Sequence, residues 1–259
     1  MTHVRSALAV ILAVVTCGVA AQSTARPANP TIPKGFTKLF DGKDLSGWRG
    51  RQPNYNPVEE AGLSKEALAA KQAQWNTDRD AHWKVDAAKG EIISDGQSPH
   101  LATAKDYGDF EMYVDWLMVS HNGDSGVYLR GYPQVQIWDP DNPREVTNGA
   151  PKGSGALWNN NDANPGKWPL VKADNPVGEW NTFRIKMVGS RVWIWLNDKP
   201  TVAGQVLDNF FARTEPLVAK GPIELQTHNS EMRFRNIFIR EIPAAEAKTT
   251  LAEAPASPK

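Results

Sequence analysis

Hydrophobic and polar side chains alternate along much of this chain, most clearly in residues 108–139. Because successive side chains of a strand point to opposite faces, a period of two predicts a strand with one buried face. Ten segments have this pattern or a strand-like composition: Phe36–Phe40, His82–Val85, Glu91–Ser94, Phe110–Val119, Gly126–Arg130, Gln134–Trp138, Trp180–Val188, Arg191–Leu196, Ile223–Thr227 and Met232–Glu241. Gly189-Ser190 and Asn197-Asp198 predict hairpin turns. Strands without intervening helices exclude a parallel α/β sheet, so we predict an all-β fold, an antiparallel two-sheet jelly-roll sandwich.

Two stretches depart from this pattern. Ser64–Asp78 is rich in Ala and predicts a short helix in an insertion after Trp48, where it would act as a lid or as an edge cover. Pro140–Glu179 is irregular and dense in Asn, Pro, Gly and Trp. Loops of this length are usually functional or disordered, and Trp158 and Trp168 favour an ordered loop that lines a site.

The polar face of two neighbouring strands has an unusual composition. Tyr128 and Arg130 alternate with apolar residues in one strand, and Gln134, Gln136 and Trp138 do so in the next. A solvated face more often carries Lys, Glu and Thr, whereas amides, Arg and aromatic rings suit the hydroxyls and the C–H face of a sugar. The pattern favours a sugar-binding face, with a plain outer sheet face as the alternative.

Composition narrows the choice of partner. The formal net charge of the 259 residues is zero and no block of Lys or Arg occurs, which argues against a nucleic-acid surface. Ten tryptophans are many for a chain of this length, and they favour aromatic platforms.

Residues 1–21 have the features of an export signal. Arg5 supplies a positive charge, Ala7–Thr16 is an apolar run too short to span a bilayer, and Val19-Ala20-Ala21 is a small-residue cleavage site. Cleavage would remove Cys17, the only cysteine, which excludes disulfides and thiol catalysis in the mature protein. Lipidation of Cys17 is the competing interpretation. We predict a soluble periplasmic or secreted protein with a flexible leader (22–34), one domain (35–242) and a disordered tail (243–259).

Several catalytic constellations are absent from the sequence. It has no Cys/His metal-ligand spacing, no phosphate-binding Gly-rich loop and no G-x-S-x-G elbow. Glu111 and Asp115 share a strand but do not form the E-x-D-x-x-E triplet that β-sandwich glucanases often use. A conventional acid-plus-nucleophile mechanism is therefore disfavoured, although carboxylates from different strands stay open as an alternative.

Four blocks, in order, resemble the 3-keto-disaccharide hydrolase domain family. They are FTKLFDGKDLSGW (36–48), DSGVYLRG (124–131) running into QVQIWD (134–139), GEWN (178–181), and GPIELQTH (221–228) with FRNI (234–237). Together they span nearly the whole predicted domain. The resemblance implies a concanavalin A-like jelly roll, which agrees with the predicted strands.

The chain departs from the family pattern at two positions. The family usually has Asn where this chain has Asp124, and Glu where it has Gln134. If both side chains face one site, the acid has moved while the net charge is kept. This makes Asp124 the more interesting carboxylate, with a turn-forming role before Ser-Gly as the alternative.

The resemblance implies elimination chemistry. A sugar oxidised at C3 has an acidic C2–H, because the carbanion delocalises into the ketone. A base removes that proton, the C1 substituent leaves, and water adds back to give net hydrolysis. Such a reaction needs one base, a group that polarises the ketone and an acid for the leaving oxygen, and it does not need two glycosidase carboxylates.

Candidate residues follow from this chemistry. His228 ends a strand on the face of Gln226 and Glu224, and we predict it as the base, with a structural histidine as the alternative. Arg130 would stabilise enolate charge, or else form a structural ion pair. Asp124 is the third catalytic candidate. The predicted substrate-binding residues are Tyr128, Gln134, Gln136, Trp138, Glu224 and Gln226.

The leading hypothesis is thus a periplasmic enzyme that cleaves an oxidised (3-keto) glycoside or disaccharide. A non-catalytic carbohydrate-binding jelly roll is the alternative, and an ordinary glycosidase is a third possibility. No cofactor is predicted. A divalent ion held by Asp124, His228 and a Gln oxygen is conceivable, but no spacing demands it. Aglycone, linkage and oligomeric state stay open.

Overall fold

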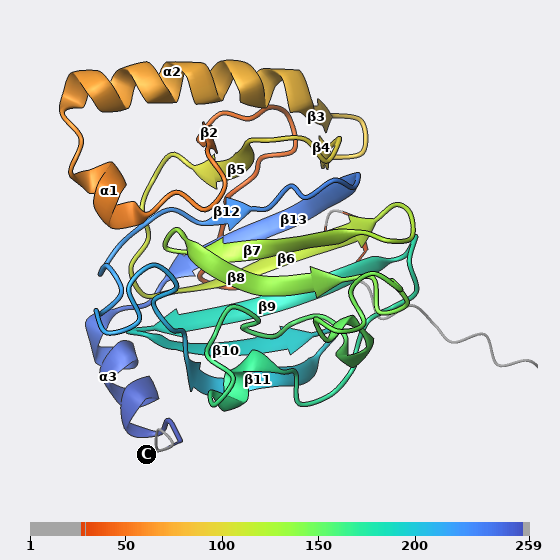
Figure 1. Cartoon of the computed structure of the whole chain (residues 1–259), viewed down its shortest axis with the longest axis vertical. Coiled ribbons are helices and arrows are strands. Elements are labelled where there is room, and N and C mark those ends of the chain that lie inside the picture. The colour runs from red at the N-terminus through yellow and green to blue at the C-terminus, as the bar shows by residue number, and fades with distance from the viewer. Residues whose placement is uncertain (1–26, 29, 256–259) are drawn as a thin grey trace, which may run out of the picture.

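The alternating segments form two antiparallel sheets that pack face to face (Figure 1). A computed structural model describes residues 27, 28 and 30–255. Apolar side chains of both sheets, including Val114, Phe183, Val127 and Ile137, are fully buried in one core. The predicted fold class, an antiparallel two-sheet jelly-roll sandwich, is confirmed.

The larger sheet has eight strands in the order β11-β10-β9-β6-β13-β4-β3, with β1 paired to β13. These strands are β1 (Thr37–Lys38), β3 (Trp83–Asp86), β4 (Glu91–Ser94), β6 (Phe110–Met118), β9 (Trp180–Val188), β10 (Arg191–Leu196), β11 (Lys199–Val206) and β13 (Met232–Glu241). The smaller sheet has five strands in the order β2-β5-β12-β7-β8. They are β2 (Trp48–Arg51), β5 (His100–Thr103), β7 (Asp124–Leu129), β8 (Tyr132–Trp138) and β12 (Glu224–Leu225).

Several sequence predictions agree closely with these strands. Strands β4, β9, β10 and β13 have the predicted bounds. Both predicted hairpin turns are present: β9 pairs with β10 across Gly189-Ser190, and β10 pairs with β11 across Asn197-Asp198. Gly189, Asn197 and Asp198 all adopt a left-handed backbone, which is the conformation such tight turns require.

Three strands were not predicted: β2, β5 and β11. The sequences of β2 (WRGR) and β11 (KPTVAGQV) contain Gly or Pro, which weaken a strand considered in isolation. Strand β5 (HLAT) is too short to show a period of two. These three strands are stabilised by pairing with their neighbours, an effect that their own sequences do not show.

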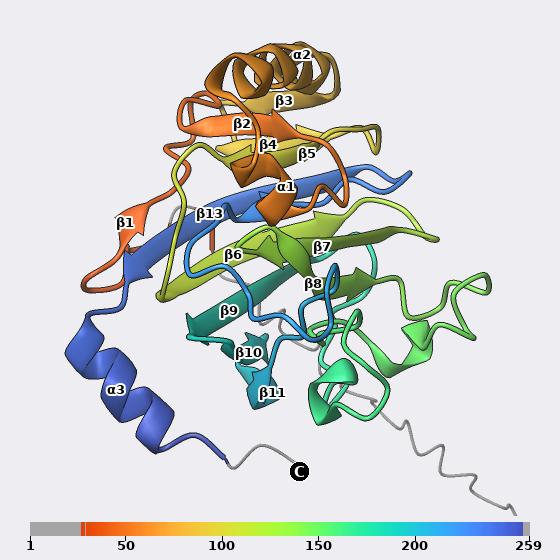
Figure 2. The same ribbon diagram turned by 60° about the vertical axis from the view of Figure 1, so that its left-hand side comes forward.

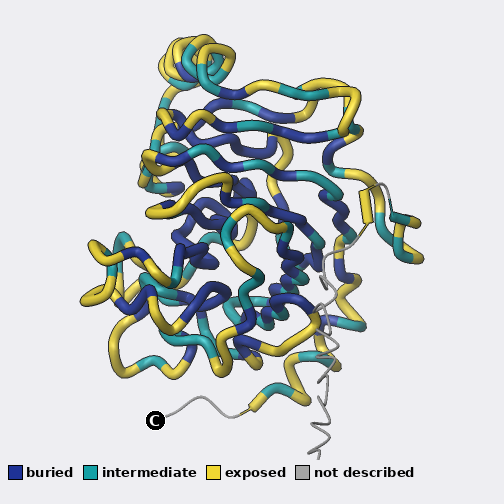
Figure 3. Tube along the Cα trace, turned by 90° about the vertical axis from the view of Figure 1, so that its right-hand side faces the viewer, coloured by how far each residue is buried: buried dark blue, intermediate teal, exposed yellow. Residues whose placement is uncertain are grey.

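Helix α2 (Lys65–His82) begins as predicted and ends later than the predicted Asp78. The Ser64 hydroxyl accepts a hydrogen bond from the Ala67 amide and caps its first turn. A short helix, α1 (Pro57–Ala61), precedes it and was not predicted. Much of the surface of α2 is exposed, whereas three of the four residues of β2 beneath it are buried (Figure 3).

Helix α2 covers β2, the edge strand of the smaller sheet (Figures 1 and 2). The Gly50 amide donates to Asn76 Oδ1 at 3.0 Å, and the Gly50 carbonyl accepts from Gln72 Nε2 at 2.9 Å. These side chains satisfy the edge groups that a further strand would otherwise pair with. A Cβ on Gly50 would lie 1.9 Å from the Trp75 carbonyl oxygen, so only glycine permits this approach. The insertion is thus an edge cover, one of the two roles considered for it.

The predicted disordered tail is wrong for residues 244–252, which form helix α3 (Ala244–Ala252) after β13 (Figure 2). Ala247 packs with Val188 and Ile242, and the Glu246 carboxylate pairs with Arg240 at 2.7 Å. Because these contacts involve β9 and β13, the composition of the tail alone could not reveal them. The predicted export signal lies outside the described residues, as do residues 22–26 and 29 of the predicted leader. No helix in the described part of the chain is long and apolar enough to cross a bilayer.

The long segment from Pro140 to Glu179 is ordered, as predicted, and part of it lies along β8. The Gln136 amide donates to the Ala156 carbonyl, and the Gly155 amide donates to the Gln136 carbonyl. This segment therefore covers the free edge of β8, as α2 covers the edge of β2. Two 3₁₀ turns, η1 (Ala150–Lys152) and η2 (Pro165–Lys167), lie within it.

Candidate functional site

The outward face of the smaller sheet forms the floor of a cleft of about 630 Å³. The floor residues are His100 from β5, Asp124 and Tyr128 from β7, Gln134, Gln136 and Trp138 from β8, and Gln226 and His228 after β12. Loop residues line its walls, among them Asn54, Gly96, Glu145, Trp158 and Phe210. The volume lies within the range of small-molecule sites.

Strand register brings the floor residues together. Asp124 is opposite Trp138, and Gly126 is opposite Gln136. The Gln226 amide donates to the Gly126 carbonyl at 2.9 Å, which extends the pairing of β12 with β7. Because Val127 and its alternating partners point into the core, the intervening side chains all face the cleft.

Asp124 and His228 form a hydrogen-bonded pair at the edge of this floor. The Asp124 Oδ2 atom lies 2.6 Å from His228 Nδ1. This hydrogen bond raises the pKa of His228 above its ordinary value against the opposing effect of burial, and the charges of Asp124 and Glu145 add to the rise. The His228 side chain is half exposed, so its imidazolium form is accessible to a ligand in the cleft.

A chain of amides connects Asp124 to Gln134, the two positions at which the family pattern is broken. Gln136 Nε2 donates to Asp124 Oδ1 at 2.7 Å, and Gln134 Nε2 donates to Gln136 Oε1. The two residues therefore face a common site, which is the condition under which the carboxylate has moved from position 134 to position 124. Gln134 and Gln136 are both buried, so their amides orient the Asp124 carboxylate.

Gln226 lies beside this chain with an unsatisfied acceptor. Its Oε1 atom is buried and accepts no hydrogen bond from any residue that the structure describes. Gly126 makes room for it, because a Cβ there would lie 2.9 Å from this oxygen and 2.9 Å from the Val135 carbonyl oxygen. A buried acceptor in a cleft is a natural partner for a ligand hydroxyl.

A second histidine–carboxylate pair lies deeper in the floor. His100 Nδ1 is 3.3 Å from Glu224 Oε2, and Arg51 Nη1 donates to Glu224 Oε1 at 2.7 Å. Arg51 also donates to Glu60 Oε2 of α1 at 2.6 Å and to the Tyr55 carbonyl at 2.6 Å. Burial would raise the pKa of the Glu224 carboxyl, but Arg51 and the His100 hydrogen bond outweigh it and hold the pKa below its usual value.

Tyr128 connects the second pair to the cleft wall. Its ring packs edge-on against His100 at 4.9 Å, and its hydroxyl donates to Asn54 Oδ1 at 2.8 Å. Burial, followed by the charges of Glu224 and Asp124, raises the pKa of the Tyr128 hydroxyl. Tyr128 therefore stays protonated and acts as a hydrogen-bonding group.

Aromatic rings border the other end of the floor. Trp138 and Trp158 meet edge-to-face with ring centroids 5.7 Å apart, and the Trp158 Nε1–H donates to the Asn148 carbonyl. Trp158 lines the cleft, as predicted for its loop. Trp168 does not line it, because its ring packs against Gly149 and beneath Lys152.

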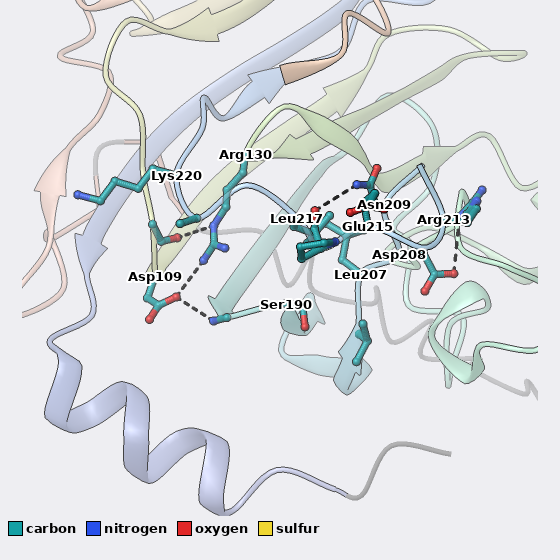
Figure 4. Close-up of a pocket in the computed structure, with 15 residues that line it drawn as sticks. Asp109, Arg130, Ser190, Leu207, Asp208, Asn209, Arg213, Glu215, Leu217 and Lys220 are labelled. Carbon is teal, nitrogen blue, oxygen red and sulfur yellow. Dashed lines mark hydrogen bonds and ion pairs between the residues drawn. The ribbon is translucent and has the colours of Figure 1, made fainter. Parts of the chain in front are cut away.

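Arg130 is not among the residues of the cleft but lies in a separate cavity, where its side chain points towards Asp109 (Figure 4). Strand β7 ends at Leu129, and Arg130 follows it with a left-handed φ of 54°. The Arg130 side chain donates to the Gly108 carbonyl and to Asp109 Oδ1, each at 2.9 Å, and lines a separate cavity. The prediction that it shares a face with Tyr128 is wrong, because the alternation stops one residue earlier. Its alternative interpretation, a structural ion pair, agrees with the geometry.

Glu224 faces the predicted side of its strand but is fully buried beneath the cleft, where it contacts Arg51 and His100 instead of lining the cavity. Sequence reasoning missed His100, Asn54 and Glu145, which come from an unpredicted strand and from two loops. The only local signal for His100 was a histidine at the start of the short apolar segment HLAT. Within the described residues, no group of three or more His, Cys, Asp or Glu side chains is arranged to hold a metal ion.

Comparison with known proteins identifies the family of this chain. A family model for the 3-keto-alpha-glucoside-1,2-lyase-like domain matches residues 35–240. The chain belongs to this family. The match confirms the resemblance seen in the sequence blocks and includes every floor residue of the cleft.

Three similar proteins share only 23% of their residues with this chain. A 3-keto-disaccharide hydrolase from Bacteroides thetaiotaomicron is 23% identical over 260 residues, which cover 82% of this chain and 80% of that protein. Two crystal structures of candidate glycosyl hydrolases from Parabacteroides distasonis are each 23% identical. Their TM-scores are 0.53 and 0.51, with 81% and 80% of this chain and 94% and 99% of those chains covered. At this identity the two structures support the fold alone.

Proposed function

We propose that this protein cleaves the C1–O bond of 3-keto-glycosides by C2 proton abstraction, elimination and hydration. The observation that carries the proposal is the Asp124–His228 pair, with its 2.6 Å contact, in a cleft that otherwise presents amides and aromatic rings. Membership of the family and the name of the Bacteroides thetaiotaomicron relative support the substrate class.

His228 is positioned for proton transfer through one ring nitrogen. Its Nδ1 is held by Asp124, so Nε2 is the atom left to exchange a proton with a bound sugar. Asp124 is itself oriented by Gln136, which restricts the rotation of the carboxylate. A carboxylate that orients an imidazole and stabilises its charged form is a recurring device of proton-transfer sites.

The ketone oxygen would be stabilised by neutral donors, because Arg130 lies in another cavity. The Asn54 Oδ1 accepts from Tyr128, so the amide hydrogens of Asn54 remain to donate to a ligand oxygen. Gln226 offers its buried Oε1 to a sugar hydroxyl, and the rings of Trp138 and Trp158 offer surfaces for the sugar C–H groups. Hydrogen-bond donors held in place before the reaction stabilise charge that develops in the transition state.

The test compares a 3-keto-disaccharide with its unoxidised parent. We expect release of monosaccharide from the keto sugar alone, and incorporation of deuterium at C2 of the product in D₂O. Binding without turnover would support a carbohydrate-binding module instead. Cleavage of the parent sugar would support an ordinary glycosidase.

We also propose that the protein is exported, on the basis of the signal-like residues 1–21. Amino-terminal sequencing of the mature protein from the periplasmic fraction should begin at Gln22. A full-length protein that stays in the cytoplasm would contradict this proposal.

A further inference from the structure

We propose that His100 is a second catalytic residue of this cleft: its Nε2 removes the C2 proton, and His228 donates the proton to the leaving oxygen. The first indication is position. Strand register pairs Leu101 with Leu225, and one further step along both strands places His100 opposite Gln226. His228 lies two residues beyond Gln226. The two histidines therefore flank one buried acceptor that has no partner among the described residues.

The second indication is the hydrogen bond that selects the His100 tautomer. Glu224 is fully buried and stays a carboxylate beside Arg51, so it accepts a hydrogen from His100 Nδ1. The lone pair of the imidazole is then at Nε2, which is the nitrogen that a base requires. Orientation of an imidazole by a buried carboxylate is the same device that Asp124 provides for His228.

The third indication is the free-energy cost of burying the charges of Arg51 and Glu224. Placing Arg51 and Glu224 out of water carries a desolvation penalty that their attraction repays only with excellent geometry, so such a pair is weak evidence for stability. Here the pair lies under a cleft and contacts its histidine. Arg51 is anchored by Glu60 and the Tyr55 carbonyl, which connects helix α1 to the His100 ring. Arg51 and Glu224 are therefore positioning residues.

The two histidines differ in the way that an acid and a base should. His228 is half exposed and bonded to Asp124, and this contact favours the imidazolium form. His100 is buried, and the charge of its carboxylate partner is already balanced by Arg51. A histidine held in its charged form can donate a proton, and one whose Nε2 carries a lone pair can accept one.

His100 Nε2 takes the C2 proton, and the C–H electron pair forms C2=C3 while the ketone becomes an enolate. The enolate collapses, the electron pair forms C1=C2, and the C1–O bond breaks as the leaving oxygen takes the proton of His228. Water then adds to C1, giving one proton to neutral His228, and the His100 imidazolium returns its proton to C2. This assignment rests on the proposed function.

The test uses matched variants of the full mature chain. His100→Asn and His228→Asn each keep a donor at the place of Nδ1 and remove Nε2. Three probes separate the steps: a 3-keto-disaccharide, a p-nitrophenyl 3-keto-glucoside that needs no acid, and 1,5-anhydro-3-keto-glucitol, which has no C1 leaving group and reports only C2–H exchange in D₂O. An enzyme-free sample gives the background exchange.

For His100→Asn we expect C2 exchange and the cleavage of both glycosides to fall by roughly 10²–10⁴-fold, the usual contribution of a general base. For His228→Asn we expect exchange and p-nitrophenyl cleavage near wild type, with a similar loss only on the disaccharide. Exchange at the wild-type rate in His100→Asn would overturn the assignment, as would loss of exchange in His228→Asn alone.

Two further measurements keep the proposal falsifiable if a variant does not fold. The ¹⁵N spectrum of the wild-type imidazoles should show His100 with a protonated Nδ1 and an unprotonated Nε2, and the opposite tautomer would overturn the assignment. A wild-type protein that neither cleaves nor exchanges any keto sugar would refute the proposed function itself. Cleavage that is normal in wild type and in His100→Asn would refute only the role of His100.

Discussion

The two histidine–carboxylate pairs of this cleft use the same groups in opposite surroundings. Asp124–His228 lies at the edge of the floor, with the His228 side chain half exposed and a 2.6 Å contact. In the second pair, His100 is a buried residue of the floor, and its partner Glu224 is fully buried beneath the floor, where Arg51 balances its charge. The difference teaches that burial and the third partner, more than residue type, determine what a histidine can do here.

The largest effect on stability is expected from removing the positive charge of Arg51, which balances the buried carboxylate of Glu224. Arg51→Met leaves Glu224 without its cation in a site closed to water. We expect the free energy of unfolding to fall by about 3–5 kcal/mol, the typical result of breaking a buried pair on one side. Urea unfolding at neutral pH measures this loss.

Arg49→Met is the matched control for that variant. Arg49 comes from the same strand and also pairs with Glu60, at 2.8 Å, but neither side chain of that pair is fully buried. We expect a smaller loss there, about 1–2 kcal/mol, because Glu60 keeps its pairing with Arg51 and only the hydrogen bonds of Arg49 to Thr103 and Gln72 and its own ion pair are lost. Equal losses in the two variants would show that Glu224 finds another partner.

A smaller effect on stability is expected at Gly126, beside Gln226 on the cleft floor. Gly126→Ala brings a Cβ within 2.9 Å of Gln226 Oε1 and of the Val135 carbonyl oxygen. We expect a loss of about 1–3 kcal/mol from overpacking, with weaker binding of the keto sugar. Calorimetric unfolding and isothermal titration measure the two quantities. Gly108→Ala, whose added Cβ would make only ordinary contacts of 3.4 Å or more, should leave both unchanged.

The edge pair can be altered without disturbing the buried one. Asp124→Asn removes the hydrogen bond that raises the pKa of His228, so that pKa should fall towards its ordinary value in an NMR titration. If His228 donates a proton, activity falls as pH rises through this pKa, and the alkaline limb of the pH profile should move to lower pH in the variant. An unmoved alkaline limb would remove His228 from the rate-limiting proton transfer.

The Asp124–His228 pair also makes the stability of the folded protein depend on pH in a definite direction. The pKa of His228 is raised in the folded state, so its contribution is fully present below the unfolded pKa and is lost as pH rises through the folded pKa. Wild type should therefore lose stability relative to Asp124→Asn across that interval. Unfolding curves at a series of pH values test the sign.

The smallest change in stability is expected for substitution of Gln226, whose buried Oε1 is the unsatisfied acceptor of the cleft floor. Gln226→Leu replaces a buried Oε1 that has no partner within the described residues, so the folded protein loses no hydrogen bond at that atom. The unfolding midpoint should stay close to that of wild type, while KM for the keto sugar rises roughly tenfold, as for one lost hydrogen bond. A fall in stability without a change in KM would show that Gln226 is structural.

Much of this molecule could be predicted from local pattern. The alternation around Val127 and Ile137 identified which faces of β7 and β8 enter the core, and it placed Gln134, Gln136 and Tyr128 on the cleft side. His228 was identified because it continues the alternation of Gln226. These inferences succeeded because side-chain direction in a strand follows from backbone geometry alone.

Other parts depend on contacts between distant segments. Arg130 continues the period of two in the sequence, but with Gly131 it forms the two-residue, left-handed turn between β7 and β8, so its side chain leaves the face of Tyr128. Gly131 marks a turn locally, but the pairing of Leu129 with Tyr132 decides that the turn already includes Arg130. Helix α3 packs on Val188 at the end of β9, which lies more than fifty residues before it in the sequence. His100 reaches the cleft only because β5 pairs with both β2 and β12.

The sequence by itself therefore determined the class of fold, the faces of its strands and the chemical character of the cleft, because each follows from neighbours within a few residues. Only the tertiary structure decided which charges meet. It brought Asp124 to His228 and joined Arg51, His100 and Glu224 from three strands. The reason is physical: hydrogen bonds and ion pairs act over a few ångströms, and strand order and register alone determine which residues come that close.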